Sequence, residues 1–185
     1  MSEYKVAGKG LRFMFLGSVI AAVGWIQVIS PFICGVASIV GALTVLYGLY
    51  QAMPAHPYYR LAMLMELVGA AVGVLRMIFK SGLLGDVVSI VGTLAALLST
   101  VFVCKATGAL LSASGADAVL AEQARLIVLL YALCAAVSIL CTLVSWIPIL
   151  NILAAITGAV TSVVMLAANV LKVFFYFKAS RALLG

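Results

Sequence analysis

Ser38-Ile39-Val40-Gly41 recurs as Ser89-Ile90-Val91-Gly92 and, more loosely, as Ala155-Ile156-Thr157-Gly158. A second signature precedes each copy: Ala21-Ala22-Val23-Gly24, Ala70-Ala71-Val72-Gly73 and Ala135-Ala136-Val137-Ser138. The two signatures keep the same order, with similar gaps between them, inside long apolar runs. Self-similarity of this kind indicates one structural unit used several times. The sequence therefore predicts three two-helix repeats, over residues 11–52, 59–112 and 121–181.

The composition around these signatures is that of a membrane protein. Hydrophobic residues make up 66% of the chain and charged residues 9%, against roughly half and a quarter in an average soluble domain. So little polar surface cannot cover a fold in water. The 185 residues allow six spans of about 20 residues each with short connections. We expect a single polytopic domain over residues 1–185, integral to a cell membrane and in contact with the lipid bilayer.

Six apolar runs can be placed along the chain. We expect the first four spans at residues 13–29, 32–50, 59–79 and 83–104, while the fifth ends near residue 146 and the sixth near residue 177. Pro31 and Pro148 lie at tight turns between spans, where a proline is tolerated in the first turn of the following helix. The stretch 105–123 is the longest polar connection, and its Ala-rich and Leu-rich flanks predict helices that extend beyond the lipid.

Basic residues predict the orientation. Arg76 and Lys80 lie near one set of span ends, and the other set has Lys5, Lys9, Arg12, Arg60, Lys105, Arg125, Lys172, Lys178 and Arg181. Because basic residues near span ends are retained in the cytoplasm, we predict that both termini are cytoplasmic. The three hairpins then insert the same way up. The predicted fold is an all-α integral membrane bundle of six transmembrane helices, arranged as three tandem helical hairpins with pseudo-threefold symmetry.

Two features of the ends and the charge have alternative explanations. The basic N-terminus before an apolar run resembles a cleavable signal peptide, but the Ala21–Gly24 signature belongs to the repeat and favours a span that is retained. The net charge of +6 is spread around the membrane ends, where it attracts anionic headgroups. Because no basic run with interleaved aromatic residues occurs, we do not expect a nucleic-acid partner.

Small residues form stripes on the expected spans. In lipid, helices associate through close backbone contact at Gly, Ala and Ser rather than through a hydrophobic driving force. The spacing in the first and third spans places such residues on one helical face, and Gly69 and Gly73 form a GxxxG motif. We expect helix packing at Gly17, Ala21, Gly24, Gly41, Gly69, Gly73, Gly92 and Gly158.

Glu66 departs from the repeat, because it holds the position of Gly17 and Tyr131. It lies about 9 Å along the helix from Arg60, at about 1.5 Å per residue. An ionisable residue inside a membrane is costly and marks a functional candidate. Asn169 and Lys172 lie at a similar depth in the last span. The sequence therefore predicts an inner polar cluster of Glu66, Asn169 and Lys172, which either fixes the packing as an ion pair or handles protons or cations.

A second polar layer is expected near the outer turns. Its members all lie within about two helical turns of those turns, and they are Gln27, Arg76, Lys80, Asp86 and Asn151. A carboxylate in the first turn of a helix, as Asp86 would be, is favoured by the N-terminal partial charge. These residues fit caps and interfacial anchors. The alternative is a shallow site for a polar or anionic solute, built from Arg76 and Lys80.

Catalytic and metal-binding patterns are missing from the sequence. The cysteines, Cys34, Cys104, Cys134 and Cys141, form no CxxC pair, and His56 has no second histidine beside it. No nucleophile elbow, zinc-protease motif or phosphate-binding loop occurs. We expect a protein that is not an enzyme and that has no metal and no cofactor.

Three functions fit these features. The first is a small channel or transporter for a small solute or ion, acting as a homo-oligomer, with Glu66, Asn169 and Lys172 lining or gating its path. The second is a non-catalytic scaffold or accessory subunit that binds another membrane protein through glycine-rich faces. The third is an effector that acts on membranes. The repeat and the intramembrane charge favour the first function.

Overall fold

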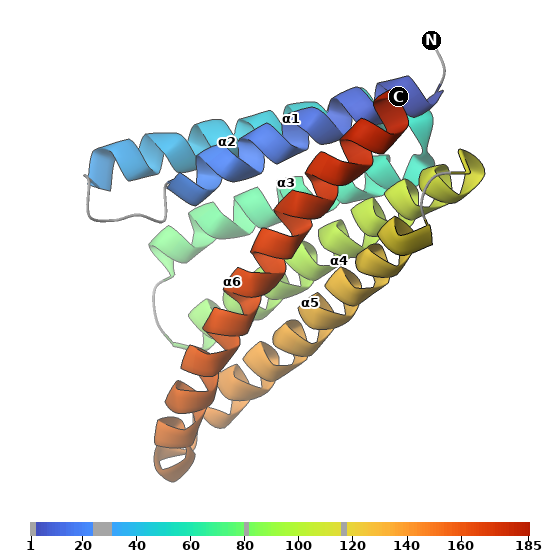
Figure 1. Cartoon of the computed structure of the whole chain (residues 1–185). Helices are drawn as coiled ribbons and strands as arrows, with labels where there is room; N and C mark the ends of the chain where they lie inside the picture. The colour runs from blue at the N-terminus through green and yellow to red at the C-terminus, as the bar shows by residue number, and fades with distance from the viewer. Residues whose placement is uncertain (1–2, 24–30, 80–81, 116–117) are drawn as a thin grey trace.

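The chain folds into a bundle of long helices in the computed structural model, which describes residues 3–23, 31–79, 82–115 and 118–185. Within these residues it contains six α-helices and one short 3₁₀ helix, and contains no strand. They are α1 (Glu3–Val23), α2 (Pro31–Ala52), η1 (Met53–Ala55), α3 (Pro57–Ile78), α4 (Leu83–Ala113), α5 (Ala118–Val144) and α6 (Pro148–Leu184) (Figure 1). Three helices begin at a proline, whose fixed φ suits a first turn. The prediction of an all-α fold is confirmed.

Five of the helices are long and apolar enough to cross a membrane, over residues 35–55, 57–76, 83–113, 119–144 and 150–184. The described part of α1 is not among them, because its first three turns contain Glu3, Lys5, Lys9 and Arg12. The rest of the expected first span, residues 24–29, lies outside the described residues. The chain is an all-α, multi-pass membrane protein, and a sixth span stays a prediction.

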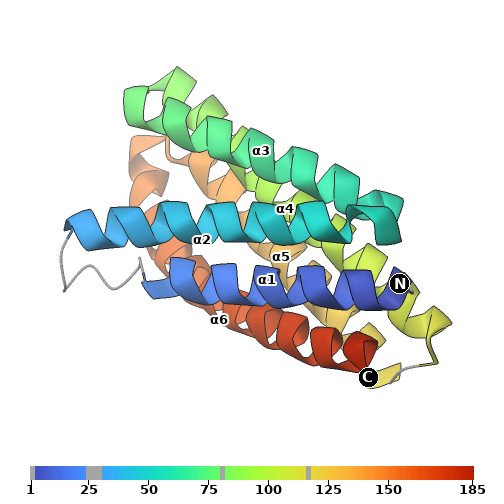
Figure 2. The ribbon, with the colours of Figure 1, turned by 90° about the horizontal axis from the view of Figure 1, so that it is seen from above.

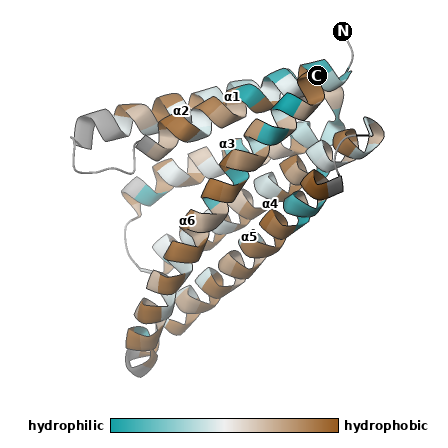
Figure 3. Ribbon diagram, viewed as in Figure 1, coloured by the Kyte–Doolittle hydropathy of each residue, from teal (hydrophilic) through white to brown (hydrophobic). Residues whose placement is uncertain are grey.

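The two ends of the bundle differ in what they contain. The start of α1, the end of α6 and the helix ends where α2 is followed by α3 and α4 by α5 lie at one end, which we call the terminal end (Figure 1). The other helix ends lie at the opposite end, which we call the turn end (Figure 1). A side-chain atom placed on Gly8 would lie 2.9 Å from Leu184, so the first and last helices meet at the terminal end. Hydrophilic residues gather on α1 and α6 near this end (Figure 3).

The helices follow one another around the bundle in chain order. Each packs against the next, the contact between α2 and α3 is the weakest of these, and α6 returns to pack against α1. Viewed from above, α1 lies between α2 and α6 (Figure 2). The pairs α1–α2, α3–α4 and α5–α6 are therefore neighbours.

Glycines make the α1–α2 contact the tightest of the described bundle. A Cβ placed on Gly17 would lie 2.6 Å from the carbonyl oxygen of Gly41, and one on Gly10 would lie 2.6 Å from that of Gly48. Seven residues, two helical turns, separate the two glycines on each helix. The two backbones touch twice along one antiparallel seam, as small residues allow in lipid.

The three helix pairs do not share one register. Gly17 meets Gly41 in the first pair, whereas Glu66, its equivalent in the repeat, hydrogen bonds to Ser99, seven residues beyond Gly92. Tyr131, the third equivalent, bonds to Asn169, eleven residues beyond Gly158. Equivalent positions thus face different partners, and neither a tandem-hairpin repeat nor a threefold arrangement is shown.

The buried core lies at the terminal end. Its residues come from the halves of the helices nearest that end, among them Leu11 of α1, Leu49 of α2, Tyr59 of α3, Ile127 of α5 and Phe175 of α6. Towards the turn end the helices diverge (Figure 1). In the turn-end part of α6, from Leu150 to Val164, only Ala154 is buried. The bundle is closed at one end and splayed at the other.

Candidate functional site

A cavity of about 450 Å³ lies where the splayed part of the bundle begins. Ser18, Val19, Ala21 and Ala22 of α1 and Ala42 and Val45 of α2 form one wall. Glu66 of α3 closes a second side, and α6 supplies the opposite wall from Leu166 to Tyr176. On α1, α2 and α3 the lining residues lie next to the core residues, on the turn-end side, and on α6 they are interleaved with the core residues Ala168 and Phe175. The core therefore forms the floor of the cavity.

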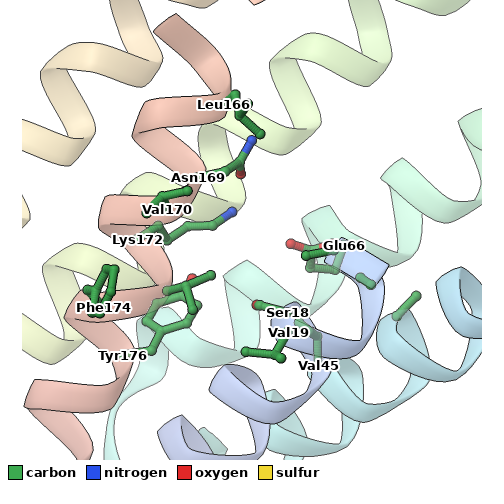
Figure 4. A pocket seen from close by; sticks show the side chains of 14 residues that line it. Ser18, Val19, Val45, Glu66, Leu166, Asn169, Val170, Lys172, Phe174 and Tyr176 are labelled. Atoms are coloured by element: carbon green, nitrogen blue, oxygen red, sulfur yellow. The ribbon is translucent and has the colours of Figure 1, made fainter. Parts of the chain in front are cut away.

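The three residues of the expected inner polar cluster line this one cavity. Lys172 extends from α6 towards α3, and the carboxylate of Glu66 faces it across the space (Figure 4). Asn169 lies about one turn before Lys172 on α6, nearer the turn end, and also lines the cavity. Apart from Ser18 and Tyr176, the remaining lining is apolar. An acid, a base and an amide are thus exposed to a space inside the apolar part of the bundle, where charges interact strongly.

Neighbouring hydroxyl groups hold the acid and the amide in place. Ser99, which is 2% exposed on α4, donates a hydrogen bond of 2.7 Å to Oε1 of Glu66. The hydroxyl of Tyr131, on α5, donates to Oδ1 of Asn169. Bonds to buried groups of this kind fix the rotamers of the polar side chains. The helices α4 and α5 thus orient groups on α3 and α6.

Lys172 has an aromatic neighbour. Its Nζ lies 4.9 Å from the ring centroid of Tyr131, within the range of a cation–π contact. Tyr131 therefore contacts both polar groups of α6, the amide through its hydroxyl and the ammonium through its ring face. Tyr176, which is buried, adds a further side chain to the cavity wall.

The floor of the cavity contains one more polar pair. The hydroxyls of Tyr59 and Thr107 are 2.9 Å apart, and both residues are 0% exposed. This pair joins α3 to α4 inside the apolar core. Since a buried hydroxyl without a partner would be costly, the pair satisfies both groups and fixes this part of the floor.

Sequence reasoning missed several residues of this region, namely Ser18, Ser99 and Tyr176, together with the Tyr59–Thr107 pair. Serine, threonine and tyrosine are common in membrane helices, so their presence alone carried no signal. The one usable signal was that Tyr131 and Glu66 hold equivalent repeat positions. Both are polar groups at the level of the cavity.

The outer polar layer is only partly described. Gln27 and Lys80 lie outside the described residues, and Arg76 and Asn151 are exposed on α3 and α6. Asp86, in the first turn of α4, accepts a 2.9 Å hydrogen bond from Nε1 of Trp146. This bond joins the start of α4 to the segment between α5 and α6 at the turn end. Among the described residues, Asp86 forms no side-chain hydrogen bond with Arg76 or Asn151.

The glycines expected at helix contacts divide into two groups. Gly17 and Gly41 lie against each other, a Cβ on Gly41 would lie 2.8 Å from that of Ala21, and one on Gly92 would lie 2.9 Å from Val72. For Gly69, Gly73 and Gly158 the structure differs from the expectation, since a Cβ there would meet nothing within 4 Å. Gly69 and Gly73 lie on an uncovered part of α3, although Val72 between them lies against Gly92 of α4. Gly24 lies outside the described residues.

The cysteines and the histidine are placed as separate residues. Cys104 and Cys134 are buried, and Cys141 is half-buried. His56 accepts a hydrogen bond from the backbone N–H of Tyr58 and so caps the start of α3. Among the described residues no group of three or more His, Cys, Asp or Glu is close enough to hold a metal ion.

The fold and the cavity define a class only: an all-α, multi-pass membrane protein with a polar site between its helices. No protein-family model matches the chain, and comparisons with curated proteins and with solved structures give no match.

Proposed function

We propose that this protein is a transporter for a small solute that carries an ionic group, and that the cavity between α1, α2, α3 and α6 is its solute site. One observation carries the proposal: Glu66, Asn169 and Lys172 converge on one cavity in the apolar part of the bundle. Charged groups in such surroundings cost free energy, and they are typical of transport sites. The volume of about 450 Å³ suits a small organic molecule.

The shape of the bundle supports a carrier rather than an open channel. The core residues Met14, Tyr59 and Phe175 are at most 1% exposed and close the terminal end beneath the cavity. The turn end is splayed (Figure 1). A site reachable from one side and closed on the other is what alternating access requires of each of its two states. Passage through the terminal end would need the floor helices to separate.

The charges of the cavity favour a solute with an anionic group, a cationic group or both. The carboxylate of Glu66 is available to a cation or an ammonium group, and Lys172 is available to a carboxylate. A bound zwitterion would satisfy both groups at once. Asn169 offers an amide that can donate to the same solute.

Transport by reconstituted protein tests this function. Vesicles containing the protein would be screened with labelled amines, carboxylates and amino acids. Glu66→Gln and Lys172→Met are each expected to lower the uptake of the transported solute by about tenfold or more, because each removes a charge from the site. Glu3→Gln, an exposed acid in the first turn of α1 away from the cavity, is the matched control. Uptake that is equal in all three variants would refute the role of the cavity.

A scaffold function is the second candidate, and the open GxxxG motif of α3 favours it. Gly69 and Gly73 have no neighbour within 4 Å in the described residues, although such motifs commonly bring helices together. The face would then pack against a second copy of the chain, as in a homo-oligomer, or against another membrane protein. Native mass spectrometry of gently released protein separates these outcomes. Replacing Gly69 with leucine should remove the added mass if α3 is the contact.

We further propose that the terminal end is cytoplasmic. The described basic residues lie mainly there, with Arg76 the exception on α3 near the turn end, in agreement with the positive-inside rule. A single cysteine introduced at Ser114, in the α4–α5 connection, should be protected from a membrane-impermeant thiol reagent in intact cells. A cysteine at Ser145, at the turn end, should be labelled.

A further inference from the structure

A second hollow lies between α4 and α5, on helices that contribute nothing to the lining of the solute cavity. This α4–α5 groove has a volume of about 1040 Å³ and lies near the terminal end. Small side chains create it: Gly108, Ala109 and Ser112 on α4 face Ala121 and Ala124 on α5. A Cβ placed on Gly108 would meet nothing within 4 Å. The two helices are neighbours here without filling the space between them.

Two cations flank the groove at the same depth. Lys105 lies on α4, eight residues before its end at Ala113, and Arg125 lies on α5, seven residues after its start at Ala118. At about 1.5 Å per residue, both are therefore about 11 Å from the connection between the helices. Both side chains are exposed. An anion held between them would contact one cation from each wall.

The rest of the lining changes from polar to apolar along α5. Glu122 lies one turn nearer the α4–α5 connection than the cations, so the acid is on the water side of them. On the other side the groove continues along Val128, Leu129, Ala132 and Leu133. Leu129 and Leu133 are each 57% exposed. Lys105 and Arg125 thus lie next to an apolar path that runs along α5 towards the lipid.

We propose that the α4–α5 groove binds one anionic phospholipid from the leaflet at the terminal end. Its phosphate would lie between Lys105 and Arg125, and an acyl chain would follow the apolar path along α5. Basic pockets between transmembrane helices recognise anionic headgroups in this way. Glu122 lies where the polar end of a headgroup would project, and its carboxylate would accept hydrogen bonds from headgroup hydroxyls.

Charge favours a lipid over a helix from a second copy of the chain. The two cations at one level need an anionic partner, and the acids of the described chain are Glu3, Glu66, Glu122 and Asp86. Of these, Glu66 is inside the solute cavity and Asp86 is at the turn end. Within the described residues a second copy therefore offers only Glu3 and Glu122 near the terminal end. A phospholipid supplies both the anion and the apolar chain.

Native mass spectrometry with defined lipids tests the site. The protein would be equilibrated with mixed micelles of phosphatidylglycerol and phosphatidylcholine, and retained lipid would be counted. The wild type is expected to retain one phosphatidylglycerol. The double variant Lys105→Gln with Arg125→Gln should retain it about tenfold less, since each cation near the surface contributes to the attraction. The matched control, Lys9→Gln with Arg60→Gln, removes two exposed cations of the same end and should retain lipid like the wild type.

A third variant separates the groove from general surface charge. Ala132→Phe adds bulk to an exposed position on the apolar path without changing any charge, and it should lower lipid retention as well. Circular dichroism would check that each variant is folded. The proposal would be overturned if both double variants lost phosphatidylglycerol equally, or if Ala132→Phe retained as much of it as the wild type. It would also be overturned if the wild type retained phosphatidylcholine as well as phosphatidylglycerol. So would a dimer that dissociates when the groove is filled, because the occupant would then be a second copy.

Discussion

The α1–α2 pair and the α5–α6 pair have related sequences but are joined by different forces. In the first pair the backbones touch at Gly17 and Gly41, and again at Gly10 and Gly48. In the second pair a Cβ on Gly158 would meet none of the described residues within 4 Å, and the described side-chain hydrogen bond between the helices runs from Tyr131 to Asn169. A glycine seam brings helices close along their length, whereas a polar pair fixes them at one level. The second arrangement leaves polar groups of α6 free to line a cavity.

Filling the glycine seam between α1 and α2 should lower the free energy of unfolding the most. Gly17→Leu would force a bulky side chain against the Gly41 carbonyl, 2.6 Å from the position of the first added carbon. We expect a loss of about 3 kcal/mol or more in the free energy of unfolding, at the upper end of overpacking effects. Unfolding by SDS titration in mixed micelles measures it. Gly158→Leu, at the open position of α6 that corresponds to Gly41 in the repeat, is the control and should change stability little.

Single methyl groups should give a smaller, graded effect. Gly48→Ala places its Cβ 2.6 Å from the carbonyl oxygen of Gly10, and we expect a loss of about 1–3 kcal/mol. Gly73→Ala has open space around it, and its better helix propensity should raise stability by up to about 1 kcal/mol. The same titration compares them. Equal effects of the two alanines would show that the glycine seam is not what holds α1 to α2.

Removing the polar pair should cost less than filling the seam. Tyr131→Phe deletes the hydroxyl that bonds to Asn169 while keeping the ring that faces Lys172. Hydrogen bonds between membrane helices average about 0.6 kcal/mol, and we expect a loss of that size. Tyr50→Phe, at an exposed tyrosine of α2, controls for the loss of a hydroxyl. A loss of stability larger than that of Gly48→Ala would mean that the polar pair contributes more than the glycine contact between α1 and α2.

The turn-end bond should matter least. Trp146 is 56% exposed, and its hydrogen bond to Asp86 lies at the edge of the bundle. We expect Trp146→Phe to lower the free energy of unfolding by about 0.5 kcal/mol, the low end of net values for a hydrogen bond. Leu143→Phe, also exposed near the end of α5, is a suitable control. A loss above that for Tyr131→Phe would mean that the turn end contributes more than its exposure indicates.

The helical membrane fold could be predicted from hydropathy, because apolar runs of this length have few other stable forms. The packing register could not. The repeated signatures identify Gly17 and Glu66 as equivalent, yet one contacts Gly41 and the other bonds to Ser99. Register depends on how whole helix surfaces fit, and a short signature does not encode that fit.

The candidate site was predictable for its charged members and not for their neighbours. Glu66 and Lys172 were singled out because charges are rare in membrane spans, and both line the cavity. Ser99 and Tyr176 are ordinary residues of such spans, and they matter only through distances that the tertiary structure sets. Gly69, Gly73 and Gly158 show the opposite case, in which small residues of a familiar kind have no partner among the described residues.

The length of α6 links the solute cavity to the surrounding bilayer. Its 37 residues span about 55 Å at about 1.5 Å per residue, more than the roughly 40–45 Å of a bilayer with its headgroups. An apolar helical stretch that exceeds the hydrocarbon thickness is accommodated by tilting, by kinking or by local thickening of the bilayer. Because α6 packs against both α5 and α1 and forms one wall of the cavity, a change in its tilt would change the width of that cavity.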